Sequence, residues 1–458
     1  MYVVNIFKNK RQFLSGGKVT EKYYIKGGTP LRGEVKIGGA KNSVLKLMAA
    51  ALLAKGATKI YNVPDLTDVE IMLNVIAELG AKTFYDKQEK SITIDASDIT
   101  NITAKYELVS KMRASFIVLG ALISRCREAI VALPGGCAIG ERRVDFHIRG
   151  LEALGAKIKI ENGYVHAKAS RLTGTDIYLD IPSVGATENL MLAGVLADGS
   201  TRIQNAAQEP EIVDLANFLN AMGADISGAG TSEIVINGVK QEQLHPIEYT
   251  TIPDRIEAGT FMTAIIATRG KAIIRDVFPA HLTFFTDKLL KMGANIKLIE
   301  PNSLEVSCKN RLNSINFITQ PYPGFPTDLQ SMAMTLLTTA NGVGIITESL
   351  YENRFMQVPE LRRMGADIHQ DRNHAIIKGV KKLTGATLAA SDLRAGASLV
   401  VAALMADGNS VIENLHHIDR GYEKFENKIR LLGGKIERRN DDILPANLTE
   451  DIHNESYL

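Results

Sequence analysis

One short phrase recurs six times along this chain and limits what the chain can fold into. The phrase is Leu-x-x-Leu/Met-Gly followed by Ala or Gly, with small variation at its head. Its glycines are Gly80, Gly155, Gly223, Gly293, Gly365 and Gly433. They lie about 70 residues apart, and a near-constant period marks a repeated structural unit. The 458 residues also exceed what one compact core accommodates, so more than one domain is expected.

Every repeat has the same order of elements. An apolar helix comes first, and the six predicted helices are 43–54, 114–124, 187–196, 258–267, 328–339 and 394–406. A glycine turn usually ends this helix, and a short β-branched strand such as 272–274 follows. A second, amphipathic helix such as 69–79 carries the repeated phrase and leads into further strand. The pattern predicts an α/β protein of six βαβαββ repeats, in two domains of three repeats each.

The polar segment 241–250, which contains Pro246, is the natural division between the domains. We expect one domain at 41–245, with repeats 1–3 and the cysteine stretch discussed below. The other domain is expected at 23–40 plus 246–440, with repeats 4–6. It is discontinuous because the N-terminal strand, 23–28, precedes the first repeat and is expected to pair with the last. The extensions 1–22 and 441–458 are polar or weakly patterned, and we expect them to be poorly ordered.

Bulk properties exclude several classes of function. The formal net charge of +2 is too small to predict nucleic acid or an anionic membrane as a partner. No run of about 18 apolar residues indicates a membrane span, and residues 1–10 lack the apolar stretch of a signal peptide. The cysteines Cys126, Cys137 and Cys308 are odd in number and lack metal-site spacing. Free thiols in a reducing compartment fit this usage, so we expect a cytoplasmic protein.

Polar residues interrupt the repeats at two equivalent places, the start of the first helix and the loop after the first strand. A basic residue at a helix start opposes the helix dipole, so helix stability does not explain it, whereas anion binding does. The basic residues at these places are Lys41, Arg113, Arg142, Arg354, Arg394 and Arg420. If both domains turn these ends inward, they line a cleft for a small, multiply charged anion. Asp328 is also at a helix start, as an N-cap or as a general base.

The stretch 133–143, Leu-Pro-Gly-Gly-Cys-Ala-Ile-Gly-Glu-Arg-Arg, places Cys137 between glycines and close to two arginines. Glycines let a segment move and let a ligand approach its backbone. Positive charge nearby favours the thiolate. From these residues alone, a tuned thiol and a surface turn with a spectator cysteine stay equally open. Cys126 and Cys308 lie in apolar helix and strand contexts and are interpreted as packing residues.

Nine segments together match a known family. They are 39–42 (Gly-Ala-Lys-Asn), 111–115 (Lys-Met-Arg-Ala-Ser), 133–140, 182–189 (Pro-Ser-Val-Gly-Ala-Thr-Glu-Asn), 205–214, 253–257 (Pro-Asp-Arg-Ile-Glu), 324–328 (Gly-Phe-Pro-Thr-Asp), 352–355 and 418–422. On these segments the chain resembles the UDP-N-acetylglucosamine 1-carboxyvinyltransferases of bacterial peptidoglycan synthesis, from about Gly27 to Arg438. The resemblance implies a two-domain inside-out α/β barrel, the enolpyruvyl transferase fold. It also implies transfer of the enolpyruvyl group of phosphoenolpyruvate to the 3′-hydroxyl of UDP-N-acetylglucosamine, through a tetrahedral ketal and with release of phosphate.

The resemblance implies a role for each matching residue. Cys137 would protonate phosphoenolpyruvate and form a covalent adduct with it, Asp328 would accept the hydroxyl proton, and Lys41 and Arg394 would assist. Phosphoenolpyruvate would bind Lys41, Asn42, Arg142, Arg354, Arg394 and Arg420, with Arg354 and Arg394 nearer its carboxylate. The UDP-sugar would bind Asn42, Arg113, Arg142, Arg143, Val144, Asp145, Phe146, His147, Ser183, Val184, Gly185, Asp328 and Leu350. Neither a metal nor a cofactor is implied, because arginines supply the positive charge.

The chain departs from the family pattern at a few positions. Arg143 and Phe146 replace the more usual residues of the nucleotide loop, Gly38-Gly39 replaces Ser-Gly, and Lys46 stands near a usual proline. None of these changes removes a catalytic group. Two alternatives remain, an enolpyruvyl transferase for another nucleotide acceptor and a silent paralogue that binds UDP-sugar. A shikimate acceptor is disfavoured by the cysteine stretch and by 183–185, and a silent paralogue by the presence of every catalytic residue. The oligomeric state is not predicted.

Overall fold

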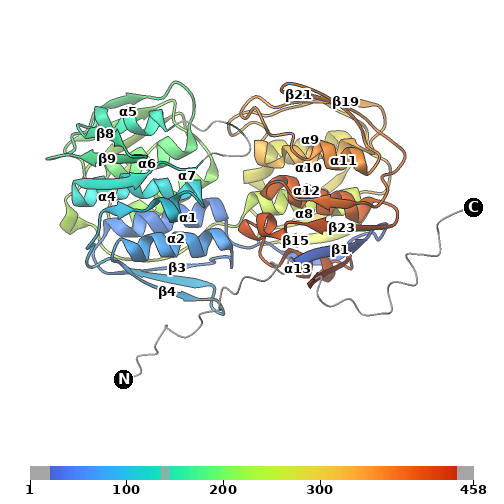
Figure 1. The fold of residues 1–458 in the computed structure, drawn as a ribbon, viewed down its shortest axis with the longest axis horizontal. Coiled ribbons are helices and arrows are strands. Elements are labelled where there is room, and N and C mark those ends of the chain that lie inside the picture. The colour runs from blue at the N-terminus through green and yellow to red at the C-terminus, as the bar shows by residue number, and fades with distance from the viewer. Residues whose placement is uncertain (1–20, 136–139, 141–143, 441–458) are drawn as a thin grey trace, which may run out of the picture.

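The computed structural model describes residues 21–135, 140 and 144–440. The predicted extensions therefore lie outside the described residues, except for Glu21 and Lys22, which begin strand β1. Figure 1 shows two lobes side by side, one holding the blue-to-green part of the chain and the other the yellow-to-red part. The blue strand β1 is an exception, because it lies in the red lobe beside β23.

In the part of the chain that the structure describes, six four-stranded sheets repeat one topology, in which the first two strands are parallel and the other pairs antiparallel. In the first domain the orders are β14 (Glu248–Thr250), β3 (Ala57–Tyr61), β5 (Ser91–Asp95), β4 (Lys82–Asp86); β6 (Thr103–Ala104), β7 (Glu128–Ala132), β9 (Tyr164–Lys168), β8 (Lys157–Glu161); and β10 (Asp176–Tyr178), β11 (Ser200–Gln204), β13 (Glu233–Asn237), β12 (Asp225–Ser227). In the second domain they are β2 (Arg32–Lys36), β15 (Lys271–Arg275), β17 (Ser303–Ser307), β16 (Asn295–Glu300); β18 (Phe317–Ile318), β19 (Val343–Thr347), β21 (His374–Lys378), β20 (Asp367–Asp371); and β22 (Thr387–Ala389), β23 (Asn409–Glu413), β1 (Glu21–Lys26), β24 (Lys435–Asn440).

The first helix of each repeat forms where the sequence predicts it, to within a few residues. These helices are α1 (Lys41–Ala50), α4 (Val118–Cys126), α6 (Val184–Gly194), α8 (Arg255–Ala267), α10 (Gln330–Leu337) and α12 (Leu393–Met405). Short 3-10 turns extend three of them, η1 (Ala51–Leu53), η2 (Arg113–Ile117) and η5 (Thr327–Leu329). The other helices are α2 (Thr67–Glu78), α3 (Tyr106–Val109), α5 (Asp145–Ala153), α7 (Pro210–Ala221), α9 (Thr283–Met292), α11 (Val358–Arg363), α13 (Phe425–Leu431), η3 (Gln241–Gln243), η4 (Pro279–Leu282) and η6 (Leu415–Arg420).

Apolar helices occupy the centre of each domain and the sheets surround them. Every residue of α8 from Arg255 to Ile266 is buried, because most of its side chains are apolar or small on all sides. Its two charged side chains, Arg255 and Glu257, are paired with Glu211 and Lys428. The strands bury alternate residues instead, as in β11, and present their other face to water. Two separate clusters of buried hydrophobic residues result, one per domain. This arrangement is the inside-out architecture of the predicted fold.

Two strands pair with a repeat that is distant from them in the chain. The predicted pairing of the N-terminal strand is confirmed, because β1 lies between β23 and β24. The division is expected within the segment 241–250, and β14 at the end of that segment pairs with β3, so the first domain extends to Thr250. The physical reason is that the first repeat lacks a leading parallel strand of its own, and β14 fills that edge. The first domain is thus one continuous segment inserted into the second.

Two backbone segments, 37–40 and 251–254, connect the domains and lie side by side. Gly39 pairs with Pro253, the Ala40 N–H donates to the Ile252 carbonyl at 2.8 Å, and the Asp254 N–H donates to the Gly38 carbonyl at 2.9 Å. The Asn62 side chain also donates to the Thr251 carbonyl at 3.0 Å. The connection is therefore a braced pair of segments, and Gly39 lies at its most crowded point.

Gly39→Ala is expected to destabilise the protein strongly, by about 3 kcal/mol or more, as overpacking at a rigid site does. A Cβ at this position would lie 1.7 Å from the Asn62 carbonyl oxygen, so one of the braced segments would have to move. Chemical denaturation followed by circular dichroism measures the loss. Gly38→Ala is the matched control, because the nearest atom to its Cβ would be 3.6 Å away. Equal stability of the two variants would contradict the crowding.

Among the described residues, no helix is both long and apolar enough to cross a membrane.

Candidate active site

Four basic residues predicted at equivalent ends of the repeats converge on two carboxylates. Lys41 begins α1, Arg394 lies in the first turn of α12, and Arg354 and Arg420 follow β19 and β23. Arg354 and Arg394 bind Asp328, whereas Lys41 and Arg420 bind Asp68. The side chains come from both domains, so these cations gather where the two domains meet.

Asp328, in η5, is held between two arginines. An Nη atom of Arg354 donates to its Oδ1 at 2.6 Å, and one of Arg394 donates to its Oδ2 at 3.2 Å. Burial raises the pKa of Asp328, but Arg394, Arg354 and Lys41 outweigh it and hold that pKa well below its ordinary value. Asp328 is not an N-cap of the usual kind, because its side chain forms no cap bond with the helix. Its carboxylate instead faces the arginines of the cleft.

Asp68 is a site residue that the sequence analysis missed. It lies in the first turn of α2 with its side chain only 2% exposed, and it accepts from Lys41 Nζ at 3.2 Å and from Arg420 Nε at 2.9 Å. Burial lowers the pKa of Lys41, while the charge of Asp68 partly opposes that shift. In the sequence, Asp68 is only an aspartate in the first turn of a helix. Its favourable interaction with the helix dipole already explains that position, so it gave no sign of a site. Its unusual burial is visible only in the structure.

Asp254 explains how a lysine can begin α1. As the N-cap of α8, its Oδ1 accepts from the Ile256 and Glu257 N–H groups at 2.8 and 3.0 Å. Its Oδ2 accepts from the Lys41 N–H at 3.2 Å. One carboxylate therefore serves the starts of two helices from different domains, and it offsets the unfavourable charge of Lys41 at a helix N-terminus.

The predicted nucleotide residues Ser183, Val184 and Gly185 form the start of α6. Ser183 is its N-cap, with Oγ accepting from the Ala186 N–H at 3.4 Å. His147 supports this turn from inside, since a Cβ at Gly185 would lie 3.2 Å from the imidazole. The His147 ring bonds Asn189 at 2.8 Å, and burial first, then Arg113 and Lys46, lowers its pKa to about 3. His147 is thus a neutral, buried ring behind the site.

Lys46 and Glu188 form a buried pair between helices α1 and α6. Lys46 Nζ lies 2.7 Å from Glu188 Oε2, and the Glu188 side chain is fully buried. Burial raises the pKa of Glu188 to about 7, and the charge of Lys46 opposes the shift. The lysine that departs from the family pattern therefore has a specific partner on a neighbouring helix. It also lies 3.5 Å from the Asn42 carbonyl, directly beneath a predicted substrate residue.

The remaining predicted residues fall into two groups. Arg113 starts η2, Val144 is the N-cap of α5, Asp145 and Phe146 lie in its first turn, and Leu350 follows β19 with its N–H bonded to Glu348. Cys137, Arg142 and Arg143 lie outside the described residues. Gly140, which is described, contacts the second domain, where a Cβ on it would lie 2.6 Å from Glu352 Oε2. Gly140 therefore lies against the loop that carries Arg354.

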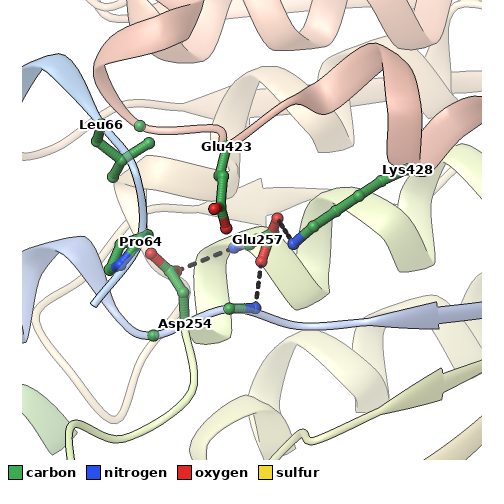
Figure 2. Close-up of a pocket in the computed structure, with 9 residues that line it drawn as sticks. Pro64, Leu66, Asp254, Glu257, Glu423 and Lys428 are labelled. Atoms are coloured by element: carbon green, nitrogen blue, oxygen red, sulfur yellow. Dashed lines mark hydrogen bonds and ion pairs between the residues drawn. The ribbon is translucent and has the colours of Figure 1, made fainter. Parts of the chain in front are cut away.

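A small pocket lies at the domain connection (Figure 2). Pro64 and Leu66 line it from the first domain, and Glu423 and Lys428 from the second. Glu257 lies between Lys428 Nζ at 2.6 Å and the Gly38 N–H at 2.8 Å. The cavity measures about 10 Å³, room for a single water rather than a substrate.

Within residues 21–135, 140 and 144–440, no three His, Cys, Asp or Glu side chains lie together as a metal site would require. The positive charges of the cleft are all arginine or lysine. Guanidinium forks are suited to phosphate and carboxylate groups, and they supply positive charge directly.

Comparisons with known proteins agree on one family. A family model described as EPSP synthase (3-phosphoshikimate 1-carboxyvinyltransferase) matches residues 25–429. UDP-N-acetylglucosamine 1-carboxyvinyltransferase 2 of Carboxydothermus hydrogenoformans is 53% identical over 92% of this chain and 100% of its own. The UDP-N-acetylglucosamine 1-carboxyvinyltransferase of Gloeobacter violaceus is 49% identical over 95% of this chain and 94% of its own. Among solved structures, the enolpyruvyl transferase NikO of Streptomyces tendae superimposes with a TM-score of 0.83 at 27% identity, covering 92% of this chain and 99% of its own.

Proposed function

The chain belongs to the UDP-N-acetylglucosamine 1-carboxyvinyltransferase family, and from that premise we propose that its cleft transfers the enolpyruvyl group of phosphoenolpyruvate to the 3′-hydroxyl of UDP-N-acetylglucosamine. The reaction releases phosphate and is the first committed step of peptidoglycan synthesis, placed in the cytoplasm. One observation carries the assignment of the site: Lys41, Arg354, Arg394 and Arg420 converge there from both domains. Four cations suit a ligand with a phosphate and a carboxylate.

In the proposed reaction, Asp328 takes the proton of the 3′-hydroxyl while that oxygen bonds to C2 of phosphoenolpyruvate. Cys137 donates a proton to the methylene carbon, C3, so that the tetrahedral ketal forms. The ketal then loses inorganic phosphate and a proton from C3, which restores the double bond in the enolpyruvyl ether. Lys41, Arg142 and Arg420 hold the phosphate, and Arg354 and Arg394 hold the carboxylate. Their positive charge stabilises the charge that develops during addition and elimination.

The ion pairs of Asp328 bear directly on its role as a base. With both oxygens bonded to arginine, its carboxylate has little tendency to accept a proton. The carboxylate of phosphoenolpyruvate competes for the same two guanidinium groups. When it binds, Asp328 loses positive neighbours and its pKa rises, so it becomes a stronger base only once the second substrate is present.

The UDP-sugar would lie on the first domain, along the start of α6 at 183–185 and the segment 142–147. Asn42 and Leu350 would contact the sugar, and Arg113 would bind the same substrate. The buried Lys46 and Glu188 pair joins the helix that carries Asn42 to the helix that carries Ser183. The two halves of the proposed nucleotide site are thereby held in a fixed relation.

Phosphate release tests the proposed function. The purified protein is incubated with phosphoenolpyruvate and UDP-N-acetylglucosamine, and inorganic phosphate is measured over time. We expect release only when both substrates are present. Parallel reactions replace the acceptor with shikimate 3-phosphate or with another UDP-sugar. Release with a different nucleotide sugar alone would favour the alternative acceptor, and no release with any acceptor would contradict the proposal and favour a silent UDP-sugar-binding protein.

A further inference from the structure

The two carboxylates of the cleft hold their cations by different atoms. Asp328 accepts from terminal Nη atoms of Arg354 and Arg394, and Arg394 also donates from its other Nη to the Tyr422 hydroxyl at 3.2 Å. Arg354 and Arg394 therefore have to break bonds at their Nη atoms before both terminal nitrogens of each can bind a ligand. Asp68 instead accepts from Nε of Arg420, on the side of the guanidinium group.

The bond at Nε leaves the terminal end of Arg420 available. The structure assigns neither Nη atom a partner among the described residues, and the side chain is 37% exposed. Two terminal nitrogens are the geometry that binds a phosphate in bidentate fashion. Lys41, the other partner of Asp68, has three donors and spends one of them on this carboxylate. Both cations therefore keep donors for a ligand while they stay bonded to Asp68.

Asp68 also connects the two domains. Asp68 and Lys41 belong to the first domain, whereas Arg420 ends η6 in the second. Beside them, Lys90 Nζ of the first domain lies 2.7 Å from Glu423 of the second. The contact between Asp68 and Arg420 thus fixes the position of a second-domain cation relative to a first-domain cation. A helix-dipole role alone would not require a carboxylate so deeply buried.

We propose that Asp68 is a positioning residue that holds Arg420 by its Nε and Lys41 by its ammonium group, and so presents both to the phosphate of phosphoenolpyruvate. The proposal rests on the proposed function for the identity of the ligand. It differs from the role of Asp328, because the bonds of Asp68 persist when the ligand binds. Asp68 itself touches no reacting atom.

Asp68→Asn tests the proposal, because it keeps the shape and removes the charge. We expect kcat/KM for phosphoenolpyruvate to fall about 10- to 100-fold, as expected for the loss of charge-assisted hydrogen bonds. The KM for UDP-N-acetylglucosamine is expected to stay within about threefold. Asp65→Asn is the matched control, because Asp65 lies just before α2 and pairs with Lys87, outside the cleft. If Asp68→Asn impaired the use of both substrates equally, its role would be purely structural and the proposal would be overturned. An unchanged kcat/KM for phosphoenolpyruvate would also overturn it.

A double-mutant cycle asks whether Asp68 acts through Arg420. A lysine at position 420 has a single nitrogen, so it cannot bond Asp68 from the side and also present two terminal donors to a phosphate. Arg420→Lys should therefore lower kcat/KM for phosphoenolpyruvate and leave the KM for UDP-N-acetylglucosamine nearly unchanged. Adding Asp68→Asn to this variant should lower kcat/KM for phosphoenolpyruvate little further. Because Arg420 is half-exposed, its substitution also supplies the test if Asp68→Asn does not fold. The coupling would be refuted if the two substitutions lowered kcat/KM for phosphoenolpyruvate additively in the folded double variant. It would also be refuted if Arg420→Lys impaired the use of both substrates equally.

A binding measurement separates this proposal from the proposed function. In protein labelled at arginine with ¹⁵N, the Arg420 Nε–H signal is identified by its absence in Arg420→Lys. Titration with inorganic phosphate should leave that proton protected from exchange while the Nη signals shift. An Nε–H that becomes exposed on phosphate binding would overturn the persistent contact, even if phosphate release is observed. Absence of phosphate release with a protected Nε–H would instead refute the proposed function alone.

Discussion

Asp328→Ala is expected to abolish turnover and leave UDP-sugar binding largely intact. A general base contributes about 100- to 10,000-fold to a rate, and no other described carboxylate contacts both Arg354 and Arg394. The loss should therefore appear in kcat, while the dissociation constant for UDP-N-acetylglucosamine changes little, since most of that ligand would contact the first domain. Phosphate-release assays measure kcat, and isothermal titration calorimetry measures the dissociation constant.

Two further variants sharpen this experiment. Asp328→Asn keeps the volume and still accepts a hydrogen bond, so it separates proton transfer from simple cavity formation. Asp367→Ala, on the exposed edge strand β20, is the matched control and should behave like the unmodified protein. A near-normal kcat in Asp328→Ala would show that the carboxylate only neutralises its two arginines and is not the base.

Cys137→Asp is expected to keep turnover and lose inactivation by the epoxide fosfomycin. A carboxylic acid can still protonate the methylene carbon, so kcat should stay within about tenfold of the original. Epoxide opening, in contrast, needs a strong nucleophile, and a carboxylate is a far weaker one than a thiolate. Residual activity after incubation with fosfomycin measures the difference. The original protein should lose all of its activity, and Cys137→Asp should lose none.

The other two cysteines provide the controls for that experiment. Burial raises the pKa of both Cys126 and Cys308, so their thiols are poorly ionised near neutral pH. Cys126→Ser and Cys308→Ser should therefore remain fully sensitive to the epoxide. If Cys137→Asp is still inactivated, or if either control becomes resistant, the adduct forms at another residue.

The repeat could be predicted from the sequence because it depends on local patterns. Glycine turns, apolar helices and β-branched strands recur in each copy, and tertiary packing did not override them. The position of β14 could not be predicted in the same way. Its three residues fit the edge of either domain, and only the vacant edge beside β3 decides between them.

The candidate site was predicted in part for a similar reason. Lys41, Arg354, Arg394 and Arg420 stood out because basic residues at helix starts and loop ends contradict local preference. Asp68 agreed with local preference, so nothing in the sequence marked it, and its burial is a property of the assembled cleft. The pairing of each carboxylate with two cations likewise depends on contacts between residues far apart in the chain.

The insertion of one domain into the other sets an order of events during synthesis. The continuous first domain, from α1 to β14, contains all the strands of its three sheets and can fold as soon as it leaves the ribosome. The segment with β1 and β2 emerges earlier but has to wait for its partners. Tyr23, for example, donates to Glu426, which is 403 residues further along the chain. The second domain is therefore completed last, beside a first domain that is already folded (Figure 1), and the catalytic cleft exists only once the last strand of the second domain has been made.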